Sequence, residues 1–170
     1  MNKKKLTIKE TLSLAWQKHQ ANDLNAAEKL YKEILRIRPE DFQSLFLLGS
    51  LFAQKQRFDS AKKLLIKAIE IEPKNLAGLN NLGNVLNELG DASKAIECYR
   101  KAIEINPNYA DAYNNLGVIL KESGEYKKAV TCYEKALKIQ PNKINVYNNL
   151  GIIFQEYGEM EKAINCYKQL

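Results

Sequence analysis

The chain has 170 residues, of which 45% are hydrophobic, and it carries a formal net charge of +6. This composition can supply a sizeable core, but no run of about 18 apolar residues occurs, so no membrane-spanning helix is predicted. The start, Met1-Asn2-Lys3-Lys4-Lys5, is basic and is not followed by the apolar stretch of a secretory signal. We therefore assign residues 1–7 to a basic tail and expect a cytoplasmic location.

Four prolines then divide the chain at a fixed period: Pro39, Pro73, Pro107 and Pro141 each follow the one before by 34 residues. Proline lacks a backbone N–H and disfavours helix at the preceding residue, so each proline marks a helix end. A fixed period of this length indicates one structural unit that buries its apolar face by stacking on its neighbours. The sequence therefore predicts repeats over 8–41, 42–75, 76–109, 110–143 and 144–170, of which the last is incomplete.

Each repeat contains two segments in which apolar residues recur with helical spacing, for example 76–89 and 92–105 in the third repeat. Gly90, Gly124 and Gly158 allow the positive φ that ends the first helix of their repeats. The acidic residue that follows each glycine suits the start of the second helix; these are Asp91, Glu125 and Glu159. Strand patterns are absent from the sequence, so an all-α fold is predicted.

Other positions of the repeat are equally regular. The eighth position is small in every repeat, with Ala15, Gly49, Gly83, Gly117 and Gly151, and the twentieth is alanine throughout, with Ala27, Ala61, Ala95, Ala129 and Ala163. Small residues at these places allow two helix backbones to approach closely, so a bulky replacement there should overpack the helix pair.

This pattern resembles the tetratricopeptide repeat (TPR) family over residues 8–170. The family's characteristic residues appear in the fourth repeat as Tyr113, Leu116, Gly117, Ala129, Tyr133, Ala136 and Pro141. The first repeat departs most, with Thr11, Ala15, Lys18 and Asn22 at characteristic places. The resemblance implies a right-handed superhelical solenoid of antiparallel helix pairs, in which the first helix of each pair lines the concave face.

The concave positions implied by the resemblance hold an unusual number of asparagines. The fifth and sixth positions form three pairs, Asn80-Asn81, Asn114-Asn115 and Asn148-Asn149, and nearby groove positions add Asn84, Asp111 and Asn145. Asparagine is a mediocre helix former, because its side chain competes for backbone hydrogen bonds, so these pairs need an explanation. Either they were copied by repeat duplication and make structural bonds, or they form a ladder of amides that pairs with an extended peptide backbone.

The second alternative resembles the TPR region of O-linked N-acetylglucosamine transferases, where sixth-position asparagines bind the peptide backbone. By that resemblance Asn81, Asn115 and Asn149 form the ladder. A net gain of about 0.5–1.5 kcal/mol per hydrogen bond is too small for micromolar binding by a few amides, which needs about 8 kcal/mol.

Apolar groove positions near the N-terminus could supply the missing affinity. Leu12, Trp16, Phe46 and Leu47 lie at such positions. They either pack between the first two helix pairs or form an apolar pocket for a partner side chain. Tryptophan is the residue most often dominant in such contacts.

Charge gives an expectation about partners. The column Glu88, Glu122 and Glu156 makes the C-terminal groove neutral to slightly acidic, which favours neutral or mildly basic protein segments. Many lysines fall on the second helices, which the resemblance places on the convex surface, and no aromatic-plus-basic recognition pattern appears on one face. We expect neither nucleic acid nor membrane as a partner.

No residues suggest catalysis or a bound cofactor or metal. Cys98, Cys132 and Cys166 recur one repeat apart, too far for a disulfide or a shared metal, and His19 is the single histidine. The sequence thus predicts a non-catalytic scaffold that holds extended peptide segments. Two alternatives stay open: a substrate-recruiting module of a larger glycosyltransferase- or sulfotransferase-like enzyme, and weak self-association through uncapped ends.

Overall fold

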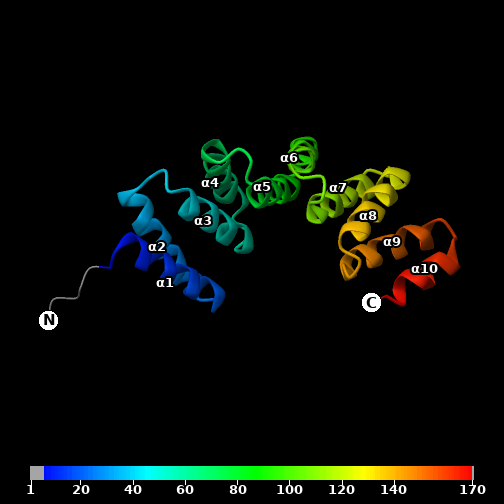
Figure 1. The fold of residues 1–170 in the computed structure, drawn as a ribbon, viewed down its shortest axis with the longest axis horizontal. Coiled ribbons are helices and arrows are strands. Elements are labelled where there is room, and N and C mark those ends of the chain that lie inside the picture. Colours follow the sequence, from blue (N-terminus) through cyan, green and yellow to red (C-terminus); the bar gives the residue numbers. More distant parts are fainter. Residues whose placement is uncertain (1–5, 170) are drawn as a thin grey trace. The chain divides into compact units, whose positions relative to one another are not determined.

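The computed structural model describes residues 6–169 and contains ten α-helices and no strand within that range (Figure 1). The helices are α1 (Ile8–Gln20), α2 (Leu24–Ile37), α3 (Phe42–Gln54), α4 (Phe58–Ile71), α5 (Leu76–Glu88), α6 (Ala92–Ile105), α7 (Ala110–Glu122), α8 (Tyr126–Ile139), α9 (Ile144–Glu156) and α10 (Met160–Tyr167). The predicted all-α fold is confirmed. Residues 1–5 of the predicted basic tail lie outside the described residues.

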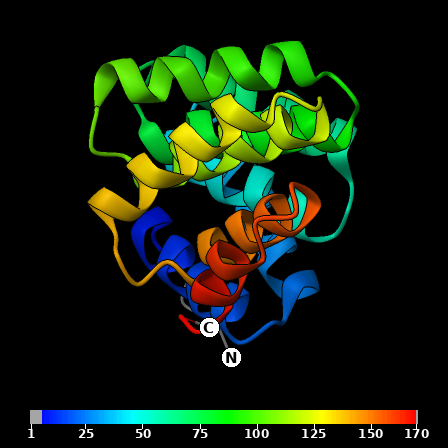
Figure 2. The ribbon, with the colours of Figure 1, turned by 90° about the vertical axis from the view of Figure 1, so that its right-hand side faces the viewer.

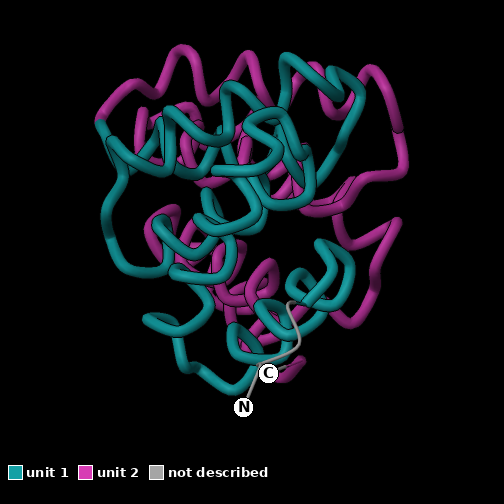
Figure 3. Tube along the Cα trace, turned by 90° about the vertical axis from the view of Figure 1, so that its left-hand side faces the viewer, with its two compact units in different colours: residues 1–89 teal, residues 90–170 magenta. Residues whose placement is uncertain are grey.

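The chain forms two compact units, residues 1–89 and 90–170, which Figure 3 shows in separate colours. Unit 1 contains α1 to α5, and unit 2 contains α6 to α10. The division falls inside the predicted third repeat, between α5 and α6. We describe each unit by itself.

Within each unit, helices that follow one another in the chain pack together. In unit 1, α1 packs on α2 and α3 on α4, and α2–α3 and α4–α5 contacts join the two pairs to each other and to α5. In unit 2, α7 packs on α8 and α9 on α10, and α6 packs on α7. The α9–α10 pair is seen at the C-terminal end in Figures 1 and 2. In four of the five predicted repeats, the two helices of the repeat pack on one another.

The turns between paired helices use the left-handed backbone conformation. Gly90, Gly124 and Gly158 have φ of 80°, 75° and 73°, as their spacing predicts. The first two repeats place Asn22 (φ 59°) and Gln56 (φ 55°) in the same conformation without glycine. Asparagine tolerates this region, whereas glutamine adopts it at a cost.

The acidic residues after these glycines behave differently from one another. Asp91 caps α6, because its carboxylate accepts a hydrogen bond from the Lys94 backbone N–H at 3.3 Å. Glu125 accepts no capping hydrogen bond and instead pairs with Lys128 one turn later. Glu159 does the same with Lys162. All three residues lie at a helix start as expected, but only Asp91 caps its helix with its side chain.

The small eighth-position residues lie where two helices meet. A Cβ added to Gly117 of α7 would lie 2.6 Å from Cε1 of Tyr133 on α8, closer than real Cβ contacts. Tyr133 is fully buried and cannot swing into solvent. The absence of a side chain at Gly117 is therefore what lets this helix pair close over the tyrosine ring.

Candidate functional site

Unit 1 contains an apolar cavity of about 540 Å³ between α1, α3 and the start of α5. Six of its ten lining residues are apolar or aromatic: Leu12 and Trp16 on α1, Phe42, Phe46 and Leu47 on α3, and Ala77 on α5. The polar ones are Lys9, Ser13, Gln43 and Asn75. A cavity of this size with an apolar lining and a few polar groups has the make-up of a ligand pocket.

Three helix starts lie at one end of this cavity. Thr7 begins α1 with a capping box, in which its hydroxyl accepts from the Glu10 N–H at 3.3 Å. Asp41 accepts from the Ser44 N–H at 2.9 Å and begins α3. Asn75 begins α5 by accepting from the Gly78 N–H, also at 2.9 Å. These caps fix where the first turns begin and so position Lys9, Phe42, Gln43 and Ala77 around the cavity mouth.

Aromatic contacts hold the cavity walls. The rings of Phe42 and Phe46 stack at 5.9 Å with an interplanar angle of 3°. Trp16 meets His19 edge-on at 5.7 Å, and Nε2 of His19 donates to Gln54 Oε1 at 3.1 Å. Trp16 nevertheless keeps 44% of its surface exposed, which is unusual for a large aromatic side chain with several neighbours. Its exposed surface is therefore available to a ligand.

His19 also contacts the core of the first helix pair. Its Nδ1 lies 3.4 Å from the hydroxyl of Tyr31, which is fully buried on α2. Burial raises the pKa of Tyr31 to about 12, so its hydroxyl stays protonated across the physiological range. The histidine is thus held on both sides by neutral partners.

A second, more polar cavity of about 450 Å³ continues from the first. The two share Trp16, Phe46 and Leu47, and the second adds His19, Gln20, Ser50, Gln54 and Asn81. Asn81 on α5 donates from Nδ2 to Ser50 Oγ at 2.9 Å. We call the two cavities together the unit 1 groove. It follows α1 from Lys9 to Gln20, a length of about 16 Å at about 1.5 Å per residue.

The predicted apolar residues therefore come together in the structure. Leu12, Trp16, Phe46 and Leu47 border one continuous open space in unit 1. Several further lining residues were not singled out from the sequence, and those at the helix starts are Lys9, Phe42, Gln43 and Asn75. Their position in the repeat could have identified them, because each lies at or beside a helix start, next to a predicted groove position.

The asparagine pairs divide by burial. The sixth-position residues Asn81, Asn115 and Asn149 are half-buried. At the fifth position, Asn80 and Asn114 are only 8% and 6% exposed, so little of either amide can be reached from solvent. Asn148 is exposed.

In unit 2 the asparagines bond to neighbouring side chains. Asn114 donates to Asn115 Oδ1 at 2.9 Å, and its own Oδ1 is buried with no partner among the described residues. Asn149 Oδ1 accepts from the ammonium group of Lys121 at 3.3 Å. These contacts give Asn114 and Asn149 structural bonds of the kind expected under the duplication alternative.

Four profiles described as tetratricopeptide repeats match the sequence, over residues 18–82, 83–124, 110–143 and 132–165. Together they span nearly all of the helical region. The chain is a tetratricopeptide repeat protein.

Solved structures of other proteins share this TPR fold. MamA is 27% identical, with 91% of each chain covered and a TM-score of 0.80. PilF of Pseudomonas aeruginosa is 20% identical, with 95% of this chain and 74% of that chain covered and a TM-score of 0.86. YrrB, described as a TPR protein with an unusual peptide-binding site, is 21% identical, with 94% and 82% covered and a TM-score of 0.73.

At their level of identity, the likeness to PilF and YrrB shows the fold alone. No curated protein matches the sequence of this TPR chain.

The remaining predicted groove residues of the TPR chain are polar and accessible. Asn84 in unit 1 and Asn145 in unit 2 are exposed. Asp111 forms an ion pair with Lys143 at 2.5 Å, and the Lys143 side chain is largely buried. The ammonium group of Lys143 reduces the acidic character that the groove positions predict for this part of unit 2.

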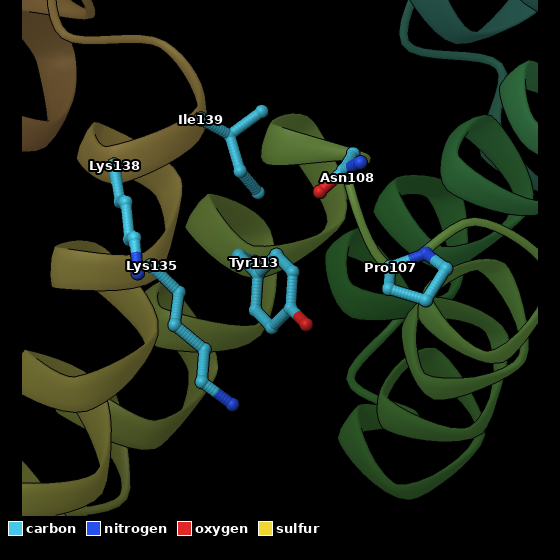
Figure 4. A pocket seen from close by; sticks show the side chains of 6 residues that line it. All are labelled: Pro107, Asn108, Tyr113, Lys135, Lys138 and Ile139. Atoms are coloured by element: carbon cyan, nitrogen blue, oxygen red, sulfur yellow. The ribbon is translucent and has the colours of Figure 1, made fainter.

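A separate pocket of about 560 Å³ lies in unit 2 of the TPR chain (Figure 4). Pro107 and Asn108 of the α6–α7 loop and Tyr113 of α7 form one side, and Lys135, Lys138 and Ile139 of α8 form the other. The Lys135 ammonium group lies 5.5 Å from the centre of the Tyr113 ring, within the range of a cation–π contact. The lysine ammonium group thus lies against the ring of Tyr113, which is only 9% exposed.

Within residues 6–169 of the TPR chain, no three His, Cys, Asp or Glu side chains gather as metal ligands would. The helices of this part of the chain are all too short or too polar to cross a bilayer. The three cysteines are free and half-buried. Burial raises the pKa of Cys98 to about 11, which disfavours its thiolate.

Proposed function

We propose that this TPR chain is a non-catalytic interaction module that binds segments of partner proteins in the unit 1 groove. One observation carries the proposal: Trp16, Phe46 and Leu47 border two adjoining cavities instead of closing into a core. Large apolar side chains at the centre of a concave surface, with polar groups around them, are what dominates binding energy at protein interfaces. The shared fold with YrrB, a peptide-binding TPR protein, is consistent with this proposal.

The asparagines have a secondary part in the proposal. Asn81 borders the groove and already bonds to Ser50, so its amide oxygen is oriented for a ligand N–H. The sequence-based ladder also includes Asn115 and Asn149 of unit 2, whose Oδ1 atoms already accept from Asn114 and Lys121, so their part in ligand binding stays a prediction. Asn80 and Asn114 are too buried for direct contact, and we assign them to support of their neighbours.

Intrinsic fluorescence gives a direct test, because Trp16 is the single tryptophan of the chain. Titration with a library of peptides of about 12 residues should change the Trp16 emission for the members that bind. Leu47→Ser should weaken binding at least tenfold. Ile66→Ser is the matched control, since Ile66 is 40% exposed on α4 and lines neither cavity.

The triple variant Asn81→Ala, Asn115→Ala, Asn149→Ala separates the amide contribution. We expect unchanged helical content and weaker binding. A library in which no peptide alters the emission, or equal binding by the Leu47 and Ile66 variants, would contradict the proposed role of the groove.

A second candidate, self-association, is favoured by exposed apolar residues on the last helix pair. On α8, Tyr126 packs edge-on against Tyr157 at 5.5 Å. Met160 occupies the same repeat position on α10 but is 55% exposed, and Ile164 beside it is 49% exposed. Sedimentation at several concentrations tests this candidate: association should be lost in Ile164→Lys, and a wild-type chain that stays monomeric throughout would exclude it.

A further inference from the structure

We infer that the partner segment in the unit 1 groove is an amphipathic helix with an acidic side chain facing Lys9, and not an extended peptide. The inference rests on the proposed function and specifies its ligand. It differs from the sequence-based expectation of an extended, neutral or mildly basic segment, which followed from acidic residues at the C-terminal groove positions.

The first argument concerns the backbone of the occupant. An extended segment would cross the groove of about 16 Å in about five residues, and its N–H and C=O groups would all need partners. The apolar cavity offers few, because most polar side chains of the groove, Asn81 among them, line the second cavity. Asn75 already accepts from the Gly78 N–H and donates to Glu72, at 2.9 and 3.2 Å, and this leaves chiefly Ser13 and Gln43.

A helix avoids this cost, because it satisfies its backbone hydrogen bonds internally and presents only side chains to the groove. The shape of the groove agrees. The two cavities follow one another along α1 and α3, so a helix laid beside them would meet Trp16, Phe46 and Leu47 at its centre. Apolar side chains at i, i+3 or i+4, and i+7 would then line one face.

The second argument is charge. Among the described residues that line the groove, Lys9 and His19 are the only ionisable ones and no carboxylate is present. Three carboxylates lie near the cavity mouth, and each is already hydrogen-bonded within the chain. Glu72 accepts from Nδ2 of Asn75 at 3.2 Å. Glu10 bonds to the backbone and hydroxyl of Thr7 at 2.8 and 2.9 Å, and Asp41 accepts from the Ser44 N–H. A cation beside apolar surface, with no internal partner in the groove, is complementary to an acidic side chain.

The N-termini of α1, α3 and α5 all border the Lys9 end of the groove, and side chains of the chain already cap all three, so Lys9 is the cation that this end offers to a ligand. Lys9 lies seven residues before Trp16 on α1, a separation of about 10 Å. An acidic residue about two turns from the central apolar residue of the bound helix would therefore reach it.

Four synthetic probes test the inference, with Trp16 emission as the signal. The first is an alanine-based helical peptide of about 16 residues, with three leucines on one face and a glutamate two turns from the central leucine. The second replaces this glutamate by lysine. The third carries a proline in mid-helix, which breaks the helix and keeps the other side chains. The fourth has the composition of the first in scrambled order.

We expect the helical glutamate probe to bind best. The lysine probe should bind about fivefold more weakly, a change in line with one partly exposed charge contact. The proline and scrambled probes should bind at least tenfold more weakly. In Lys9→Glu the order of the glutamate and lysine probes should reverse, while Lys63→Glu, on the exposed face of α4, should leave it unchanged.

The outcomes separate the two proposals. If the proline probe binds as well as the helical one, the bound segment is not a helix, although a peptide-binding groove remains. If Lys9→Glu leaves the probe order unchanged, the acidic contact is wrong. If neither these probes nor the unstructured library alters Trp16 emission, the proposed function fails together with the inference.

Discussion

Gly117 allows the helix packing to be tested in one position. In Gly117→Ala the new Cβ would lie 2.6 and 2.9 Å from two ring carbons of Tyr133, which is fully buried and cannot move aside. Overpacking of this kind costs about 1–3 kcal/mol, and the better helix propensity of alanine returns about 1 kcal/mol. Gly117→Ala should therefore destabilise by about 0–2 kcal/mol. Gly117→Leu adds three more carbons to the same space and should cost about 3 kcal/mol or more.

The first repeat indicates that the destabilisation by Gly117→Ala lies at the lower end of this range. Ala15 and Tyr31 occupy the equivalent positions there, and both are fully buried. An alanine can thus be accommodated when the two helices are spaced for it, whereas no repeat places a larger residue at this position.

Urea unfolding followed by circular dichroism measures these differences from the midpoint and slope. Lys127→Leu, on the exposed face of α8, controls for the apolar substitution. In a Tyr133→Leu background the cost of Gly117→Ala should fall without vanishing, because a Cβ added to Gly49 would lie 2.9 Å from Leu65, the leucine at the equivalent position, against 2.6 Å from Tyr133. An unchanged midpoint for Gly117→Leu would refute the helix register, and equal costs in both backgrounds would refute the clash as the cause.

Three further predictions concern single residues. Gln56→Gly should raise the free energy of unfolding by about 0.5–1 kcal/mol, because φ of 55° strains a side chain but not glycine; the urea midpoint reports it. Burial raises the pKa of Glu28, but hydrogen bonds and charges from Lys32 and Lys55 outweigh it and lower the pKa to about 2. This stabilisation is present above pH 4.5 and is lost as the pH falls toward 2, so Glu28→Gln should cost about 1–2 kcal/mol at pH 7 and flatten the acid limb of a stability–pH curve. Cys98, with its pKa raised to about 11 by burial, should react with a thiol reagent at pH 7.5 at least tenfold more slowly than free cysteine, and an equal rate would contradict its burial.

The fold could be predicted from the sequence because residues that act on the local backbone recur at a fixed spacing. Proline and glycine act within a few residues of themselves, so their spacing predicted helices at 76–89 and 92–105, and the structure has Leu76–Glu88 and Ala92–Ile105. The non-glycine turn at Gln56 could not be found in this way. Gln56 lies in the turn between α3 and α4, and its left-handed conformation has no signature in the residue itself.

Only part of the candidate site could be predicted from the sequence. Periodicity placed Trp16, Phe46 and Leu47 on one face, and that face lines the groove. Periodicity could not tell that Asn114 is buried while Asn148, at the same repeat position, is exposed, because burial depends on what packs against each helix. Nor did the sequence reveal that Lys9 lines the groove while no carboxylate of the described residues does, since that depends on where the helix starts place their side chains.

The close fit between the eighth-position residue and the side chain opposite it has an evolutionary consequence. Each such contact is made inside a single helix pair, as Gly117 shows with Tyr133 and Gly49 with Leu65. A substitution on one helix can therefore be compensated on its partner without disturbing other pairs. Drift of this kind would let the repeats diverge one at a time, and the groove they carry could change its preferred ligand while the scaffold beneath it stayed the same.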